Sequence, residues 1–366
     1  MDLIAFARGV PAPEMLPVDE LRAAAARAFE RDPVKVLSYG TGGGWEPLRQ
    51  RLAERHGVQH DQVVVTTGSL QGFSLLAQVV ARRAAADGRR ARVIVENPTY
   101  DRPLLLLERL GIEVVSVPLD ADGVDPEALD AEMAAGADFA YLIPTYQNPA
   151  GSTLTQDRRA AVLDAARRHG VLVLEDDPYG LLHFDEPAPA TLFEQRGDAP
   201  VAFSGSFSKT IAPGLRVGWL VLPAELASQV ATLANDTYIS ASFLGQATVD
   251  EFLAAGAFEA NVERARELLR ERRDRIVRAL ADELPGANFT PPQGGYFIWV
   301  RLPDGLDAAA VSREAASHGV SFVAGSSFGA RQDAYARLAF SSPRLDQIEL
   351  GVRRFADACA ASLAHA

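Results

Sequence analysis

Residues 61–72 read DQVVVTTGSLQG, and they begin a regular alternation between short apolar runs and helical segments. The run at 63–67 has the β-branched composition that is typical of a strand, and residues 69–86 show a helical pattern. We expect further strands, each followed by a helix, at 92–96, 113–117 and 138–143, and another strand at 171–175. Strands separated by helices predict βαβ units and a mostly parallel sheet with helices on both faces.

Two more strands, expected at 201–205 and 216–222, bring this sheet to seven strands. Residues 223–282 then show a helical pattern, and the residues after them are typical of a smaller α+β domain. The chain has 366 residues, which exceeds the roughly 250–300 at which a single core stops growing. We therefore expect a large domain at 41–282, which includes a long connecting helix, and a small domain at 283–366.

The composition disfavours several classes of protein. The net charge is −12 with no basic stripe, so the chain has no electrostatic reason to bind nucleic acid or anionic lipid. No apolar run approaches the roughly 18–20 residues of a membrane span, and no signal peptide is visible. The single cysteine, Cys359, cannot form an internal disulfide. We expect a soluble, cytoplasmic protein without nucleic-acid or membrane partners.

Polar, turn-rich segments follow five of the expected strands. Ligands of such sheets bind beyond the carboxyl ends of the strands, so these segments are the first candidates for a site. They read TTGSLQG (66–72), ENPTY (96–100), PTYQNPAG (144–151), EDDPYG (175–180) and SGSFSK (204–209).

Each segment also has an ordinary structural explanation. GSLQG is compatible with an anion site at a helix N-terminus and equally with a simple Gly–Ser cap. EDDPY fits a carboxylate on a pyridinium nitrogen or the cap of a turn, and QNPAG fits an amide donor or a plain turn. Tyr100 fits stacking on a flat ring or ordinary packing. No single segment distinguishes its functional explanation from its structural one.

Lys209 is one of only two lysines, with Lys35, among 36 basic residues. Arginine cannot form a Schiff base, whereas a primary amine can, and pyridoxal phosphate requires that chemistry. Arg216 is a good phosphate ligand by geometry, or else a surface ion pair. Arg337 lies inside an expected strand, where a half-buried guanidinium needs an anion: a substrate carboxylate or a structural Asp or Glu.

Other site types find little support in the sequence. The six histidines show no metal-ligand spacing, and we expect no metal. The segment YGTGGGW (39–45) departs from the dinucleotide fingerprint, because Trp45 takes the place of the last glycine. This disfavours a nicotinamide-dependent dehydrogenase.

The order of the motifs is more specific than any one of them. The chain carries, in this order, G-S-x-Q-G, E-N-P-x-Y, Q-N-P-x-G, E-D-D-P-Y, S-F-S-K and R-L-A-F-S. Together these motifs resemble those of fold-type I pyridoxal-phosphate enzymes, namely class I/II aminotransferases. Within these, the chain is most similar to the 2-aminoadipate/kynurenine aminotransferase-like subgroup. The resemblance runs from about Phe6 to the last helix, and it implies the PLP-transferase fold of type I. It also implies that residues 1–40 form an N-terminal segment that contributes to the small domain and the active site.

The resemblance implies a role for each candidate residue. Lys209 would hold pyridoxal 5'-phosphate as an internal aldimine and, once freed, act as general base and acid. Asp176 would face the pyridine nitrogen, while Tyr179 and Asn148 would hydrogen-bond the ring oxygen. The other implied cofactor contacts are stacking by Tyr100 and phosphate binding by Ser69, the Leu70 amide, Ser206, Ser208 and Arg216.

The substrate and the partner follow from the same resemblance. Arg337 would grip the substrate carboxylate, with Asn148 and Gly9 lining the substrate site. Tyr39 matches a tyrosine that family members lend to the neighbouring subunit's phosphate, which implies a homodimer with active sites at the interface. The implied reaction moves an amino group between an L-amino acid and a 2-oxo acid such as 2-oxoglutarate or pyruvate.

The sequence also departs from its relatives in two places. Relatives usually carry an extra helix before the F-x-x-G-x-P segment, near which this chain starts, and Leu70 stands where Gln is common. The alternatives are a pyridoxal-phosphate-dependent lyase, oxidase or racemase acting on an amino acid, or a non-catalytic aminotransferase-like sensor. The complete set of motifs argues against the sensor.

Overall fold

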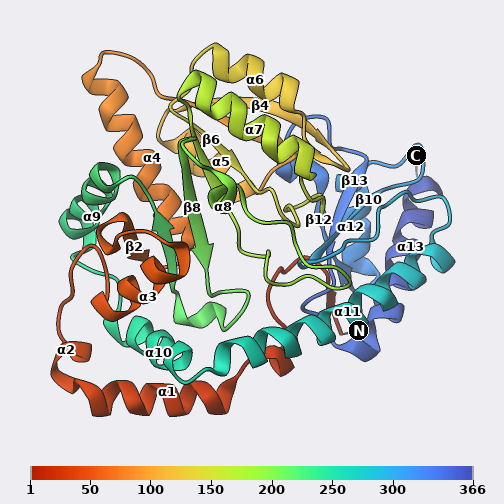
Figure 1. Cartoon of the computed structure of the whole chain (residues 1–366). Coiled ribbons are helices and arrows are strands. Elements are labelled where there is room, and N and C mark those ends of the chain that lie inside the picture. The colour runs from red at the N-terminus through yellow and green to blue at the C-terminus, as the bar shows by residue number, and fades with distance from the viewer. Residues whose placement is uncertain (1, 365–366) are drawn as a thin grey trace.

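An eight-stranded sheet forms the centre of the large domain in this computed structural model, which describes residues 2–364 (Figure 1). The strand order is β2-β9-β8-β7-β6-β3-β4-β5. The strands are β2 (Val63–Thr66), β3 (Arg92–Asn97), β4 (Glu113–Asp120), β5 (Gly123–Val124), β6 (Phe139–Leu142), β7 (Leu172–Asp176), β8 (Val201–Ser206) and β9 (Gly218–Val221). All neighbours from β4 to β8 pair in parallel, whereas β9 is antiparallel to β2 and β8, and β5 to β4.

Helices cover both faces of this sheet because its strands are apolar on both sides. Val64 and Leu174 face one helix layer, while Val65 and Val173 face the other, as alternation along a strand requires. The first layer consists of α4 (Ser69–Ala86), α5 (Asp101–Arg109) and α9 (Ala224–Tyr238). The second includes α3 (Glu46–His56), α6 (Pro126–Ala134), α7 (Gln156–His169) and α8 (Leu192–Gln195).

A long helix leads from the large domain to the small one. Helix α10 (Phe243–Ala254) packs along α1 (Val18–Arg31), and α2 (Pro33–Leu37) follows α1. Helix α11 (Ala257–Glu283) then runs under the molecule to α13 (Ile348–Ala364), as Figure 1 shows. This places the two domains side by side along one connecting helix.

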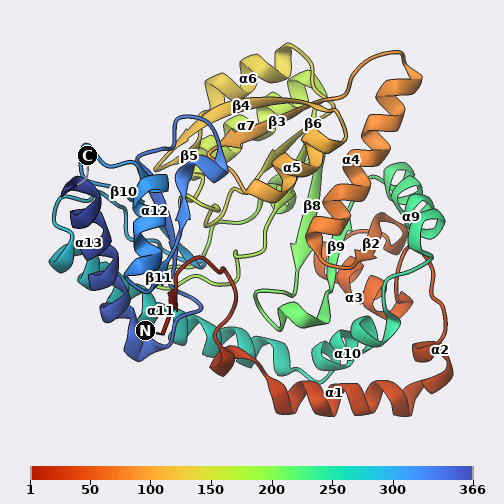
Figure 2. The ribbon, with the colours of Figure 1, turned by 180° about the vertical axis from the view of Figure 1, so that it is seen from behind.

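The small domain is an α+β unit that includes the start of the chain. Its antiparallel sheet has the order β10 (Phe297–Arg301), β13 (Tyr335–Ala339) and β12 (Val323–Ala324), and α12 (Ala308–Ser317) packs on α13. Strand β1 (Ile4–Ala5) pairs in parallel with β11 (Val320–Ser321), so the N-terminal segment lies against this domain (Figure 2). We retain 1–40, 41–282 and 283–366 as a proposed division; residues 1, 365 and 366 lie outside the described part.

The predicted fold class is confirmed: a mostly parallel sheet of seven strands, extended at its edge by the two-residue β5, beside a smaller α+β domain. The apolar run VSFV at 320–323 predicts a single strand, and this is wrong in detail, because the chain divides there into β11 and β12. Each of these pairs with a different distant strand, β1 or β13, and such pairings leave no local signal. Helices α2 and α8 were also not predicted, being only five and four residues long.

Candidate active site

A cavity of about 540 Å³ lies at the carboxyl ends of the parallel strands, between the large and small domains. Twelve of the thirteen candidate residues from the sequence line it. They are Gly9, Ser69, Leu70, Tyr100, Asn148, Asp176, Tyr179, Ser206, Ser208, Lys209, Arg216 and Arg337. The thirteenth, Tyr39, is 86% exposed on the loop after α2 and does not line the cavity of its own chain.

Lys209 follows β8 and points its amine into the cavity. Its Nζ donates a hydrogen bond to the Gly9 carbonyl oxygen at 2.6 Å. Burial, together with the positive charges of Arg337 and Arg216, lowers the pKa of Lys209 to about 8, against the opposing effect of Asp176. A larger fraction of this amine is therefore neutral near pH 7 than for an ordinary lysine, and the neutral form is the nucleophile and the proton acceptor.

Asp176 ends β7 with its carboxylate on the cavity wall. Oδ2 accepts from the Tyr141 hydroxyl at 2.7 Å, and Oδ1 accepts from the Ser204 hydroxyl at 2.8 Å. Burial raises the pKa of Asp176, while these two hydrogen bonds and Lys209 oppose the rise. The sequence analysis did not identify Tyr141 or Ser204, although each places a hydroxyl in a mainly apolar strand.

The N-terminus of α4 opens into the same cavity. Gly68, at φ 83°, precedes the helix, and no side chain caps the first amides at Ser69 and Leu70. The Arg216 guanidinium crosses this turn, with Nη2 donating to the Thr67 carbonyl oxygen at 3.1 Å. A Cβ at Gly68 would lie 2.5 Å from that guanidinium, and the positive φ also favours glycine at this position. An uncapped helix end beside a guanidinium forms an anion site.

Two serines complete this anion site. The Ser206 hydroxyl oxygen accepts from the Ser208 amide at 3.1 Å, which leaves its own hydrogen for another acceptor. Both side chains line the cavity with Arg216. Hydroxyls, amides and a guanidinium are the donors that a phosphate group takes, so the residues present fit the phosphate of pyridoxal 5'-phosphate.

Arg337 on β13 is only 7% exposed, yet its described contacts are with neutral groups. Nη1 donates to Asn148 Oδ1 at 2.9 Å and Nη2 to the Ala7 carbonyl oxygen at 3.0 Å, while Nε has no partner. The centroids of the Phe297 and Phe328 rings lie 4.2 and 4.7 Å from the guanidinium carbon, Cζ. Within residues 2–364, no carboxylate forms an ion pair with Arg337, which disfavours a structural Asp or Glu as its anion. A buried cation of this kind is suited to an external carboxylate.

Two phenols border the region where a ring would lie. Tyr179 is buried, and burial raises its pKa well above the usual value; burial likewise raises the pKa of Tyr100 to about 12. Both hydroxyls therefore stay protonated at neutral pH and can donate hydrogen bonds.

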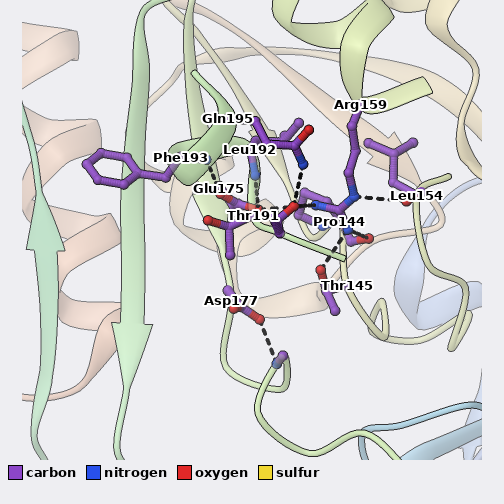
Figure 3. A network of polar contacts seen from close by, with 12 residues as sticks. Pro144, Thr145, Leu154, Arg159, Glu175, Asp177, Thr191, Leu192, Phe193 and Gln195 are labelled. Carbon is purple, nitrogen blue, oxygen red and sulfur yellow. Dashed lines mark hydrogen bonds and ion pairs between the residues drawn. The ribbon is translucent and has the colours of Figure 1, made fainter. Parts of the chain in front are cut away.

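A buried ion pair links α7 to β7, the strand that ends at Asp176 (Figure 3). Arg159 on α7 donates from Nη2 to the Pro144 carbonyl oxygen at 3.0 Å and to Thr145 Oγ1 at 2.8 Å. Its Nη1 lies 3.7 Å from Glu175 Oε1, and neither side chain is exposed. Glu175 also accepts from the amides of Leu192 and Phe193 at 3.0 and 2.8 Å.

The Arg159–Glu175 pair joins the exits of β6 and β7, the strands that lead to Asn148 and Asp176. Burial and Asp177 raise the pKa of Glu175, and the amides and Arg159 oppose this. Because both carboxyl oxygens accept N–H groups, the contacts stabilise the ionised form. Nothing in the sequence predicts this pair, because Arg159 is one of several arginines in the same helix.

A second support holds the turn that carries Asn148. Glu96 Oε2 accepts from the Ile143 amide at 3.0 Å and from Gln147 Nε2 at 3.1 Å. Gln147 also donates to the Pro98 carbonyl oxygen at 2.8 Å. The first residues of the ENPTY and QNPAG segments thus contact each other, which fixes the two turns as one unit.

Comparisons with known proteins agree on one family. The family described as aminotransferase class I and II matches residues 2–355. The chain is 34% identical to the 2-aminoadipate transaminase of Thermus thermophilus, covering 99% of this chain and 91% of that protein. The solved α-aminoadipate aminotransferase LysN from Thermus thermophilus, in complex with N-(5'-phosphopyridoxyl)-L-leucine, has a TM-score of 0.92, 33% identity and 100% and 94% coverage. The kynurenine aminotransferase of Pyrococcus horikoshii has a TM-score of 0.92, 31% identity and 99% and 92% coverage.

Proposed function

Because this chain belongs to the class I and II aminotransferases and is a pyridoxal-phosphate-dependent transaminase of fold type I, we propose that Lys209, Asp176 and Arg337 carry out the amino transfer. The observation that supports the proposal is one cavity in which three groups converge: the Lys209 amine with its lowered pKa, the Asp176 carboxylate, and the buried Arg337 guanidinium, which has no ionic partner among residues 2–364. Members of the 2-aminoadipate/kynurenine subgroup are among the relatives to which the chain is similar.

The residues divide into cofactor and substrate contacts. When bound, pyridoxal phosphate supplies an aldehyde that captures amines and a ring that withdraws electrons from the substrate Cα. Arg216, Ser69, the Leu70 amide, Ser206 and Ser208 hold its phosphate. The remaining proposed cofactor contacts are those of Asp176 to the ring nitrogen, Asn148 and Tyr179 to the ring oxygen, and Tyr100 to the ring face.

Lys209 acts on the proton that must move during the reaction. Once the substrate amine has displaced it from the cofactor, its neutral Nζ would accept the proton from the substrate Cα and return it to the former aldehyde carbon of the cofactor. Arg337 and Asn148 fix the substrate carboxylate, so that the Cα–H bond is held toward this amine. Phe297 and Phe328 cover the guanidinium and keep water from it, which strengthens its attraction for the carboxylate.

The substrates are an L-amino acid and a 2-oxo acid, and the α-carboxylate is the group that both share. The names of the relatives suggest which donors to test first: 2-aminoadipate, kynurenine and the aromatic amino acids. The test is a donor screen with 2-oxoglutarate and pyruvate as acceptors, in which formation of the new amino acid is measured. Release of ammonia or hydrogen peroxide, or inversion of the donor, without a new amino acid would instead indicate a lyase, an oxidase or a racemase.

We also propose a cytoplasmic homodimer in which Tyr39 binds the phosphate in the neighbouring subunit. Tyr39, Leu37 and Val34 are 86%, 71% and 75% exposed, and such a group of exposed apolar side chains is typical of an interface. Over residues 2–364, no helix has both the length and the apolar character needed to cross a membrane.

A further inference from the structure

Both oxygens of the Asp176 carboxylate are held by hydroxyls from the two neighbouring strands. Tyr141 on β6 donates to Oδ2 at 2.7 Å, and Ser204 on β8 donates to Oδ1 at 2.8 Å. Ser204 is the direct register partner of Asp176, and Tyr141 pairs with Leu174, two residues earlier on β7. The register of the sheet therefore fixes the positions of the two donor hydroxyls.

The two hydroxyls have no evident packing role. Tyr141 and Ser204 are 1% and 2% exposed, and the Tyr141 ring packs edge-on against Phe73 with centroids 5.0 Å apart. Phenylalanine and alanine would fill the same space without a polar atom. A buried hydroxyl is costly unless it finds a partner, and here the partner of both hydroxyls is Asp176.

The contacts act on the charge state of Asp176. Burial disfavours a carboxylate, whereas each donated hydrogen bond stabilises it. A carboxylate has about four lone-pair sites, so two internal donors leave room for a third donor on the cavity side. Its charged and titratable surroundings are Lys209 after β8, Glu96 on β3, Asp177 after β7, and the phenols of Tyr100, Tyr141 and Tyr179.

We propose that Tyr141 and Ser204 are positioning residues that keep Asp176 ionised and aimed into the cavity, so that the proton between Asp176 and the cofactor's ring nitrogen stays on the nitrogen. The inference rests on the proposed role of Asp176. Without the donors, the carboxylate becomes more basic and takes more of that proton. A ring without that proton withdraws less electron density from the nitrogen that links Lys209 to the cofactor. The pKa of this linking nitrogen therefore rises.

The test is a pH titration of the visible absorption of the cofactor-loaded protein, for Tyr141→Phe and Ser204→Ala. One hydrogen bond to a charged group is worth about 1–2 pKa units on the carboxylate itself. We expect the absorption midpoint to rise by a part of that, roughly 0.5–1 unit in each variant. The turnover rate should fall by roughly tenfold while the KM for the amino donor is unchanged, since the substrate contacts are intact.

Tyr238→Phe is the matched control, because it removes a phenol hydroxyl that contacts Gln71 on α4, and it should titrate like the wild type. Unchanged midpoints in both test variants, or a shift in the control, overturn the inference. A shift in one variant alone assigns the role to that residue and removes it from the other. The melting temperature of the cofactor-free protein verifies folding, and Ser204→Ala, the smaller change, carries the test if Tyr141→Phe does not fold.

Asp176→Ala separates this inference from its premise. If Asp176→Ala titrates like the wild type, the proposed role of Asp176 itself is wrong. If the midpoint shifts in Asp176→Ala but in neither Tyr141→Phe nor Ser204→Ala, only the role of the two hydroxyls is wrong.

Discussion

The Lys209 amine donates to the carbonyl oxygen of Gly9, a residue 200 positions earlier in the chain, at 2.6 Å. Gly9 follows β1, which pairs with the small domain, whereas Lys209 follows β8 of the large domain. A Cβ at Gly9 would lie 2.4 Å from the Phe297 ring, so the N-terminal segment passes close to β10 only because this residue is glycine. The amine thus lies where three parts of the chain meet.

Lys209 is expected to be the attachment point of the cofactor, and the sequence offers an unusually clean control. Only one other lysine exists, Lys35, which lies on α2 with its amine 5.1 Å from the centre of the Trp45 ring. After borohydride reduction, intact mass should show the adduct in Lys35→Ala and none in Lys209→Ala. An equal adduct in Lys209→Ala would refute the assignment.

The reactivity of this amine is expected to titrate near its lowered pKa. The pKa of Lys209 falls from 10.5 to about 8 through burial, so the neutral form is half populated near pH 8. The rate at which cofactor-free protein captures pyridoxal phosphate should rise through that pH and then level off. Because Arg337 lowers the pKa, the midpoint should move upward in Arg337→Met. A midpoint near 10.5 in the unmodified protein contradicts this prediction.

Much of the site could be predicted from the sequence because it lies at strand exits. Asp176 ends an apolar strand, and Asn148 and Lys209 each follow one within a few residues, so a local pattern locates them. Parallel strands then bring those exits to one edge, and twelve candidates line one cavity.

The support behind the site could not be predicted, because it depends on pairs far apart in the chain. Tyr141 reaches Asp176 across 35 positions, and Asn148 contacts Arg337 across 189. Arg159 illustrates the same limit: it follows an equally plain arginine, Arg158, and only the fold decides which of the two is buried.

Arg337 is expected to determine the affinity for both substrates. Lysine at this position keeps the charge but loses the forked geometry, and alanine also leaves Asn148 without its donor. A charged hydrogen bond is worth about 1.5–3 kcal/mol, so KM for donor and acceptor should rise roughly 10–100-fold in Arg337→Ala. Arg344→Ala, an exposed arginine that pairs with Asp346, is the control and should leave KM unchanged. An unaltered KM in Arg337→Ala would place the carboxylate elsewhere.

Arg159→Met is expected to destabilise the protein by about 3–5 kcal/mol, because it removes one partner of a fully buried pair and leaves Thr145 Oγ1 without its donor. Urea denaturation of the cofactor-free protein measures this loss. Arg168→Ala on the same helix removes an exposed pair with Asp130 and should cost less than about 1 kcal/mol. Similar losses of unfolding free energy in the two variants would show that the buried pair contributes no more to stability than the exposed pair.

Tyr39 is expected to act in the partner's active site, and mixed dimers can test this. It lies 86% exposed outside its own cavity, so Tyr39→Phe should weaken cofactor binding by roughly tenfold through the loss of one hydrogen bond to a charged phosphate. In a mixed dimer, a Lys209→Ala subunit still offers Tyr39 to the Lys209-bearing site of a Tyr39→Phe subunit. Mixing the two variants should therefore restore tight binding at that site, whereas a Lys209→Ala/Tyr39→Phe double variant should not. If mixing restores nothing, Tyr39 does not act across the interface.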